Sequence, residues 1–196
     1  MIYGSHNTFS YLKPKFWILN LFKPFTVCQD KNLEEQVESG VTAFDLRIFV
    51  TKFGSIHLSH GYYIYDVDLE TVISKILKVI NSNKKKQFYL RVMLENVNGS
   101  DFQKQIFRNI CDYLLDKFSN KNIKLFGGCD KYGKERIYRF VDNYLYVEFD
   151  EFHASVSGKG IMKILPRIFN EKNISKRKEY INNKEKSNSK VWIDFI

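Results

Sequence analysis

Two histidines, each set in a short polar motif, are the side chains best suited to chemistry in this sequence. His6 lies in the run Gly-Ser-His-Asn-Thr-Phe at positions 4–9, and His60 lies in His-Leu-Ser-His-Gly-Tyr at positions 57–62. Between them, Asp45 and Arg47 are two positions apart, so on an extended strand their side chains point the same way. Two imidazoles can act as general base and general acid near neutral pH, and a guanidinium can bind phosphate oxygens with two hydrogen bonds. These groups could move a proton between two hydroxyls while stabilising charge on phosphorus.

Length and composition indicate one folded domain over residues 1–196. The chain is 44% hydrophobic and 16% aromatic, which is too apolar for a disordered protein. Cys28, Cys111 and Cys129 have no metal-type spacing, so we interpret them as buried or incidental thiols. No apolar run reaches the roughly 20 residues of a membrane span, and the first motif leaves no room for a signal peptide. We therefore expect a soluble protein that is cytoplasmic as given, with secretion left open if a leader was removed.

The net charge of +9 is compatible with binding to nucleic acid or to an anionic membrane. Part of the excess lies in a polar stretch at 172–190, which we interpret as a solvated loop or helix face, or alternatively as a docking site for acidic lipid headgroups. Its basic residues are Lys172, Lys176, Arg177, Lys178, Lys184, Lys186 and Lys190. Because no nucleic-acid recognition motif accompanies the charge, we expect no nucleic-acid partner.

Apolar runs of strand type alternate along the chain with amphipathic runs of helical period. The predicted strands cover 2–3 with the first motif, 41–50, 56–59, 87–94, 123–126, 144–149 and 191–196, and the predicted helices cover 30–40, 68–80, 102–118 and 160–169. Ser100 and Gln103 form a capping box, Pro166 interrupts the last helix, and 155–160 is predicted to be an irregular segment. This alternation predicts βα units around a largely parallel sheet, with the chemistry at the C-terminal ends of its strands.

Five blocks in order along the chain resemble the catalytic X region of phosphatidylinositol-specific phospholipase C. They are the two histidine motifs, Asp45-Leu46-Arg47, the run Leu-Arg-Val-Met-Leu-Glu-Asn at 90–96, and Val-Trp-Ile-Asp-Phe-Ile at 191–196. The resemblance implies a compact, irregular TIM-type (βα) barrel, shorter than the about 250 residues that such barrels usually take. It also implies a phosphodiester cleavage in which the inositol 2-hydroxyl attacks phosphorus and releases diacylglycerol and a cyclic inositol phosphate.

By the same resemblance, His6 is the general base for the inositol hydroxyl, and Asp194 holds the other nitrogen of His6. His60 is the general acid for the departing glycerol oxygen. Arg47 binds the phosphate oxygens, and Asp45 contacts an inositol hydroxyl or supports a histidine. Of the remaining histidines, His57 is interpreted as structural and His153 matches no motif.

The residues that carry the resemblance match both a calcium-dependent and a metal-independent branch of the family. Asn7, Asp45 and Glu95 match oxygen ligands of the calcium-dependent branch, whereas Arg47 matches the metal-independent branch, in which a guanidinium replaces the ion. Two cations at one place repel, so we expect no calcium, with Asn7 and Glu95 binding substrate or Arg47. If calcium does bind, those three residues are the expected ligands.

Residues 9–25 interleave aromatic side chains with lysines, a composition typical of a membrane interface. Phe16, Trp17 and Phe22 are the predicted interfacial residues, and the alternative is that this segment covers the barrel. The expected partner is a phosphatidylinositol-containing membrane surface, approached by a monomer.

Two other functions stay open. One is a glycerophosphodiesterase-like barrel, although such enzymes open with a His-Arg-Gly motif that this chain lacks. The other is a catalytically silent X-like module that binds phosphoinositide, although such a module needs neither His6, Arg47 nor His60. The lipid itself, whether plain, phosphorylated or glycosyl-linked, is not determined by the sequence, and Arg47 favours the simple bacterial substrates.

Overall fold

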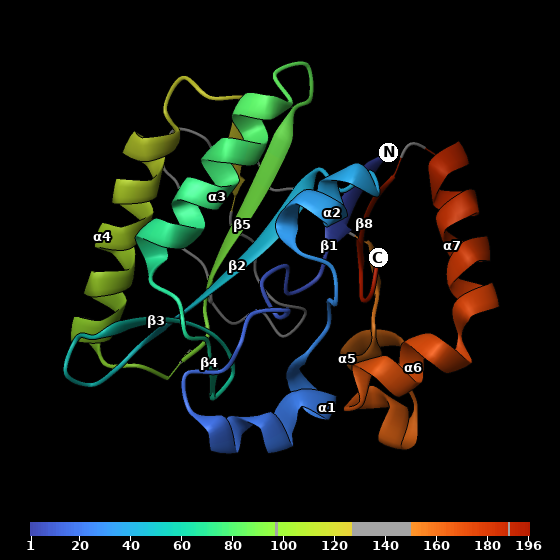
Figure 1. Cartoon of the computed structure of the whole chain (residues 1–196), viewed down its shortest axis with the longest axis horizontal. Coiled ribbons are helices and arrows are strands. Elements are labelled where there is room, and N and C mark those ends of the chain that lie inside the picture. The colour runs from blue at the N-terminus through green and yellow to red at the C-terminus, as the bar shows by residue number, and fades with distance from the viewer. Residues whose placement is uncertain (97, 127–149, 188) are drawn as a thin grey trace.

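The computed structural model describes residues 1–96, 98–126, 150–187 and 189–196, which form a curled, mostly parallel sheet flanked by helices (Figure 1). Six strands run parallel in the order β6-β5-β2-β1-β8-β7. The strands are β1 (Ile2–Ser5), β2 (Ala43–Val50), β3 (Ile56–His60), β4 (Tyr63–Ile64), β5 (Phe88–Leu94), β6 (Ile123–Phe126), β7 (Asp150–Phe152) and β8 (Lys190–Ile193).

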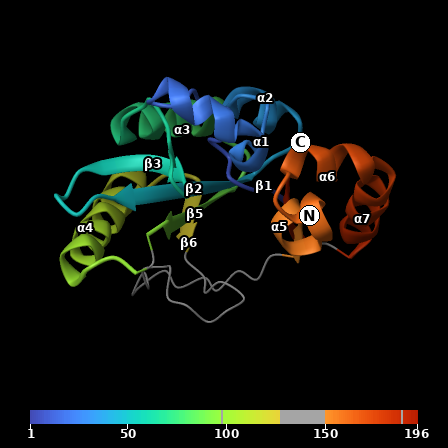
Figure 2. The same cartoon turned by 90° about the horizontal axis from the view of Figure 1, so that it is seen from below.

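Helices surround this sheet. Figures 1 and 2 place α3 and α4 beside the β2–β5 part, and α5, α6 and α7 on the opposite side near β8. The α-helices are α1 (Lys23–Thr26), α2 (Leu33–Glu38), α3 (Leu69–Ser82), α4 (Asp101–Phe118), α5 (Ala154–Ser157), α6 (Pro166–Lys172) and α7 (Ile174–Lys186), and two 3₁₀ helices are η1 (Trp17–Phe22) and η2 (Gly160–Lys163). Within the described part of the chain, no helix is both long and apolar enough to cross a bilayer.

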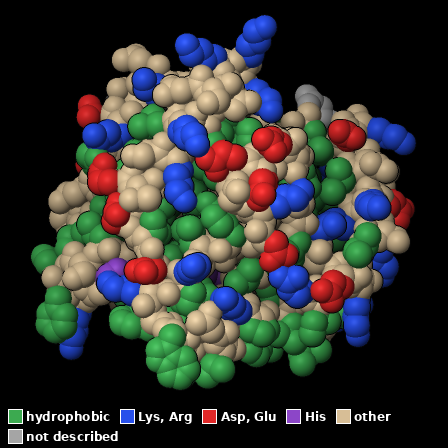
Figure 3. All heavy atoms as spheres, viewed as in Figure 1, with side chains coloured by type: hydrophobic (Ala, Val, Ile, Leu, Met, Phe, Trp, Pro, Cys, Tyr) green, Lys and Arg blue, Asp and Glu red, His purple; other side chains and the backbone are tan. Residues whose placement is uncertain are grey.

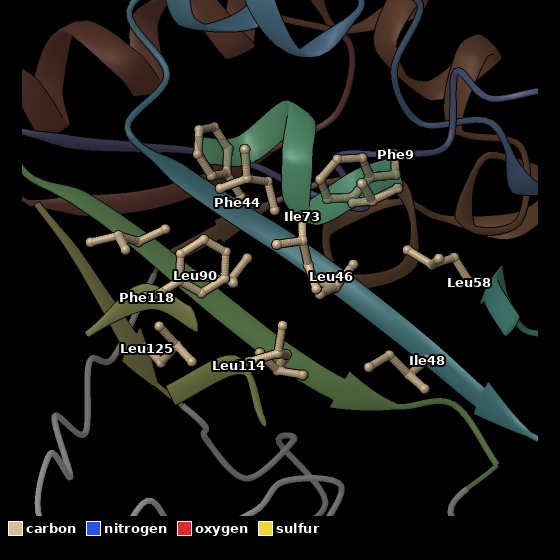
Figure 4. Packing of buried hydrophobic residues seen from close by; sticks show 14 of the residues in the cluster. Phe9, Phe44, Leu46, Ile48, Leu58, Ile73, Leu90, Leu114, Phe118 and Leu125 are labelled. Carbon is tan, nitrogen blue, oxygen red and sulfur yellow. The ribbon is translucent and has the colours of Figure 1, made fainter. Parts of the chain in front are cut away.

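Strand β2 separates the hydrophobic core from the polar interior of the sheet. Its alternate residues Phe44, Leu46, Ile48 and Val50 are fully buried in the main core, together with residues of β5, α3 and α4 (Figure 4). Because successive strand residues point to opposite faces, its other positions face inward. The neighbouring strand β5 alternates in the same way, so the inward faces of both strands can carry polar groups while their outward faces pack against helices.

The β2–β3 connection is short, as expected from a sequence that predicts no helix between the strands at 41–50 and 56–59, but it makes these two strands antiparallel and not parallel. β3 pairs antiparallel with the end of β2, with Ile48 opposite Leu58, and a tight turn at 51–55 joins them through a hydrogen bond from the Thr51 amide to the Ser55 carbonyl. Gly54 takes φ +86° there, a conformation that glycine adopts without steric cost. Five residues are too few for the crossover that parallel strands need, so His60 comes from a hairpin.

Helix caps follow the sequence closely. Ser100 and Gln103 form the predicted capping box at the start of α4, and Asp68 caps α3 by accepting a hydrogen bond from the Thr71 amide. The apolar stripe of α3 is buried as its periodicity predicts. These ends fix α3 and α4 against the outer face of the sheet.

The last third of the chain differs in part from the predicted elements. The strand predicted at 144–149, like Cys129, lies outside the described residues, and the next described strand is β7, which begins at Asp150. The segment predicted to be irregular at 155–160 includes most of α5, and Pro166 begins α6 instead of interrupting a helix, because proline is favoured where the first amide needs no partner. The basic stretch is mainly the exposed helix α7. Cys28 and Cys111 are buried free thiols, as expected.

Candidate active site

The side chains predicted to be catalytic lie together where the central parallel strands end. His6 follows β1 directly, and Asp194 follows β8 directly. β1 and β8 are paired, with Ser5 opposite Ile193, and the His6 amide donates to the Ile193 carbonyl at 3.0 Å. Two residues separated by most of the chain are therefore adjacent because their strands are neighbours.

Hydrogen bonds determine the tautomer of His6. Its Nδ1 lies 2.7 Å from Oδ1 of Asp194, and its Nε2 lies 2.9 Å from Nη2 of Arg47. An ionised carboxylate only accepts and a guanidinium only donates, so Nδ1 carries the proton and Nε2 presents its lone pair. Oδ2 of Asp194 accepts from the Ala154 amide at 3.0 Å. The ring is thus held as a general base requires.

His60 faces the same place from the hairpin. Its Nδ1 donates to the Thr26 carbonyl at 2.8 Å, since a carbonyl can only accept, and this leaves Nε2 for a proton or a substrate atom. The rings of His6 and His60 are edge-on with centroids 6.3 Å apart. At that separation both rings can contact the same bound group.

Arg47 lies at the centre of the cluster, with every nitrogen of its guanidinium engaged. Nε donates to Asp45 Oδ2 and Nη1 donates to Glu95 Oε1, each at 2.9 Å, while Nη2 meets His6. Burial by itself lowers the pKa of Arg47, but Asp45 and Glu95 raise it above the ordinary value. Arg47 therefore stays charged and fixed in position.

Asp45 is an anchor for two guanidinium groups. Besides Arg47, it accepts two hydrogen bonds from Arg91, Nε at 3.0 Å and Nη2 at 3.0 Å, and one from the Asn7 amide at 2.9 Å. Burial raises its pKa, but Arg47 and Arg91 together lower it well below the ordinary value. The carboxylate is fully buried, so the geometry suits it to orienting arginines more than to touching an inositol hydroxyl.

The three candidate calcium ligands do not fit a calcium ion in this arrangement. Calcium takes six to eight oxygen ligands, whereas the carboxylates of Asp45 and Glu95 both hold the guanidinium of Arg47. Asn7, at φ +49°, directs its amide nitrogen to Thr26 and receives the Tyr65 hydroxyl on its side-chain oxygen, both at 3.4 Å. The cation of this site is the side chain of Arg47.

Sequence reasoning missed three residues of the cluster: Arg91, Glu151 and His153. Arg91 carries the bonds to Asp45, lies 3.6 Å from Glu151, and stacks 4.2 Å from the Trp192 ring. A charged residue on the inward face of the otherwise apolar strand β5 was a usable signal for Arg91. His153 stacks on His6, with ring centroids 3.9 Å apart and an interplanar angle of 1°. No motif marked Glu151 or His153, because only the fold brings 150–153 beside β8.

His6, His153 and Asp194 bring possible metal-ligand atoms within 4.8 Å of one another, and zinc uses such donors. An imidazole binds a metal along its lone pair, in the plane of the ring. Parallel rings 3.9 Å apart share no in-plane point, so these two rings in this arrangement do not fit a single ion.

Burial makes both catalytic candidates weak bases in the free protein. Burial first, then the nearby His153, lowers the pKa of His6 to about 4, with Arg47 adding to this effect and Asp194 opposing it. Burial and Arg47 also lower the pKa of His60, against the opposing charge of Glu95. Both rings are therefore neutral at pH 7 before a ligand arrives.

An exposed apolar surface lies beside the cluster. The predicted interfacial residues Phe16, Trp17 and Phe22 are 53%, 79% and 51% exposed, and Leu21 is 66% exposed. In Figure 3, hydrophobic side chains gather with lysines and arginines along the lower edge, where Figure 1 places α1 and α6. The alternative prediction, that residues 9–25 cover the barrel, holds for Phe9, which is buried in the core. We call residues 16–25 the apolar rim; its following residue, Thr26, holds His60.

No protein-family model and no curated protein matches this sequence. Among solved structures, the phosphatidylinositol-specific phospholipase C from Listeria monocytogenes superposes with a TM-score of 0.67 at 16% identity, over 99% of this chain and 87% of that one. The chain has the fold of a phosphatidylinositol-specific phospholipase C. The prediction of an irregular TIM-type barrel is thereby confirmed.

Structures of the phosphatidylinositol-specific phospholipase C from S. aureus are also similar to this chain. A double mutant has a TM-score of 0.51 at 19% identity, over 68% of this chain and 49% of that one. A structure concerned with modulation of membrane binding has the same TM-score and identity, over 76% and 54%. The chain thus spans about half the length of the S. aureus enzyme. At these identities the likeness establishes the fold, and the chemistry rests on the cluster itself.

Proposed function

We propose that this protein is a phosphatidylinositol-specific phospholipase C that splits the phosphodiester by intramolecular attack. A bond forms between the inositol 2-oxygen and phosphorus, and the bond from phosphorus to the glycerol oxygen breaks. The products are a cyclic inositol phosphate and diacylglycerol. The observation that carries this proposal is His6, whose proton is fixed on Nδ1 by Asp194 while Nε2 points to Arg47, with the ring centroid of His60 6.3 Å away.

His6 is the proposed general base. Nε2 takes the proton of the 2-hydroxyl, and the Asp194 carboxylate stabilises the imidazolium that forms. In the free protein Arg47 occupies Nε2. The substrate must therefore draw Nη2 of Arg47 onto a phosphate oxygen. This exposes the lone pair on Nε2 of His6 when the reactive groups come together.

Arg47 is the proposed phosphate ligand. Its Nε and Nη1 stay hydrogen-bonded to Asp45 and Glu95, so the Nη2 group released from His6 is held in a fixed direction. Charge that builds up on the phosphate oxygens in the transition state then meets a preorganised cation in a buried place, where its effect is strongest. Glu95 acts by orienting Arg47, and Asn7 lies beside it to bind the headgroup.

His60 is the proposed general acid. It must carry a second proton on Nε2, although in the free protein its pKa is lowered. A bound phosphodiester places a negative charge next to the ring, which raises that pKa. Substrate binding thus charges His60, and the departing glycerol oxygen receives its proton.

The proposed place of action is a membrane surface, which a monomer binds peripherally. The apolar rim exposes Trp17 and Leu21 next to Lys23, and such rings enter the headgroup layer while ammonium groups stay hydrated. The rim adjoins Thr26, which hydrogen-bonds His60. A lipid headgroup can therefore reach the cluster while its acyl chains stay in the bilayer.

The decisive experiment incubates the protein with phosphatidylinositol vesicles and follows the products by phosphorus NMR. Cyclic inositol phosphate is expected from the wild type, with losses of about 10²-fold to 10⁴-fold in kcat for His6→Ala and for His60→Ala. His57→Ala is the matched control and should retain activity. Vesicle binding without any product would favour a silent module, and cleavage of glycerophosphoinositol alone would favour a glycerophosphodiesterase. Either result rejects the proposal.

A second experiment tests the rim. Trp17→Ala should weaken co-sedimentation with phosphatidylinositol vesicles by about tenfold to a hundredfold, because burying a large aromatic ring contributes roughly 1.5–3 kcal/mol. It should leave cleavage of a monomeric short-chain lipid within twofold of the wild type. Ile174→Ala, at a half-exposed apolar position on α7, is the control and should bind normally. Equal losses of Trp17→Ala on both substrates would remove the interfacial role.

A further inference from the structure

His153 is a buried imidazole that the proposed mechanism leaves unused. It is 4% exposed, and it lies between β7 and α5. No proton transfer of the proposed mechanism uses it. Its ring covers that of His6 face to face, at 3.9 Å between centroids and 1° between planes. A contact this flat constrains the plane in which the His6 ring can lie.

The orientation of His153 is fixed independently of His6. Nε2 lies 3.4 Å from a carboxylate oxygen of Glu151, and Nδ1 lies 2.8 Å from the Ser155 hydroxyl. The other oxygen of Glu151 is 3.6 Å from Arg91. Because a carboxylate only accepts, Nε2 of His153 carries a proton towards Glu151, and Nδ1 shares a hydrogen bond with the Ser155 hydroxyl. The stacking partner of His6 is thus held at both of its nitrogens.

This arrangement supplies what Asp194 cannot. Once the substrate has drawn Arg47 away from Nε2, the hydrogen bond at Nδ1 alone lets the His6 ring turn about the line to the carboxylate, and such a turn moves Nε2 away from the substrate. A flat ring against one face removes that freedom and also excludes water from it. Among the described residues, the charged or titratable groups around His6 are Asp194 from the end of β8, Asp45 and Arg47 from β2, His60 from β3, Glu151 from β7 and His153 itself.

We propose that His153 is a positioning residue: by stacking on His6, it fixes the plane of the general base and excludes water from one face of that ring. This inference rests on the proposed function for its kinetic consequence, but its structural consequence can be measured without turnover. The pKa of His6 is lowered chiefly by burial, which agrees with a ring that water does not reach.

The test compares His153→Ala with His153→Phe, which keeps a flat ring but not the nitrogens. Imidazole NMR reports the tautomer and the pKa of His6 in the free protein. In the wild type, His6 should keep its proton on Nδ1 and stay neutral down to about pH 4. In His153→Ala the pKa should rise by at least about one unit as water reaches the ring, and the tautomers should mix. In His153→Phe the single tautomer should remain, with a smaller rise in pKa.

Kinetics on a monomeric short-chain phosphatidylinositol give the second measurement. His153→Ala should lower kcat by roughly tenfold to a hundredfold, since a small misplacement of a reacting group has this effect, while KM stays within twofold. His153→Phe should recover most of kcat. Unchanged His6 tautomer and pKa in His153→Ala would overturn the inference, as would a kcat within twofold of the wild type. If the wild type turns over no lipid, the proposed function fails, and the NMR result still decides whether His153 positions His6.

Discussion

The burial of a neutral His6 has a consequence for stability that can be measured without substrate. In the folded protein its pKa is about 4, whereas in the unfolded chain a histidine has its ordinary value of 6.5. Between these values the unfolded state binds a proton that the folded state does not. The free energy of unfolding must therefore fall as the pH is lowered from about 6.5 towards 4.

The size of the effect follows from the shift. At pH 5 the difference between pH and the unfolded pKa is about 1.5 units, and at 1.36 kcal/mol per unit His6 contributes a loss of about 2 kcal/mol. The buried carboxylates have lowered pKa values, so their contribution to stability is lost only at more acidic pH, below about 4.5, where carboxylates become protonated. The window from pH 7 to pH 5 is therefore dominated by histidines.

The assay is urea denaturation of the wild type and of His6→Gln at pH 7 and at pH 5. His60, whose pKa is also lowered, contributes to both proteins and cancels in the comparison. The wild type should lose about 2 kcal/mol more than His6→Gln between the two pH values. Equal losses in the two proteins, to within about 0.5 kcal/mol, the usual error of additivity, would refute a buried, neutral His6.

Three further predictions concern the centre of the cluster and the sheet below it. Arg47→Lys should lower kcat by about 10²-fold to 10³-fold, because an ammonium cannot hold two carboxylates and a phosphate in the geometry of a planar fork; steady-state kinetics with KM close to the wild type would support this, and an unchanged kcat would contradict it. Excess chelator should leave lipid cleavage unchanged, since Arg47 already provides the cation between Asp45 and Glu95; loss of activity that calcium restores would show this to be wrong. Gly4→Ala should destabilise the fold by about 1–3 kcal/mol, because a Cβ there would lie 2.4 Å from the Trp192 ring; an unchanged urea midpoint would count against such close packing.

Much of the site follows from local patterns. The period-2 alternation of β2 places Asp45 and Arg47 on one face, and strand-end motifs mark His6, Glu95 and Asp194. Ser100 and Asp68 begin their helices because their side chains satisfy amides that a helix leaves free. Such signals depend on residues close in sequence, and for that reason they can be interpreted without the fold.

Other features depend on contacts between distant segments. The sequence predicted no helix between the strands at 41–50 and 56–59, but the antiparallel direction of the strand that carries His60 is seen only in the fold, because a short apolar strand has the same pattern in either direction. Arg91 and Glu151 acquire their partners only when β5, β7 and β8 converge on one interior.

The sequence alone thus indicated the class of fold and the candidate acids, bases and cation, since the motifs carry the family resemblance and spacing decides which side chains share a face and which lie at strand ends. The tertiary structure decided how they act. It placed two carboxylates around Arg47 so that no calcium ion fits there, and it laid His153 flat on His6. The resemblance already favoured Arg47 over calcium, but neither set of contacts could be inferred from spacing, because the orientation of a buried side chain is set by all the groups that surround it at once.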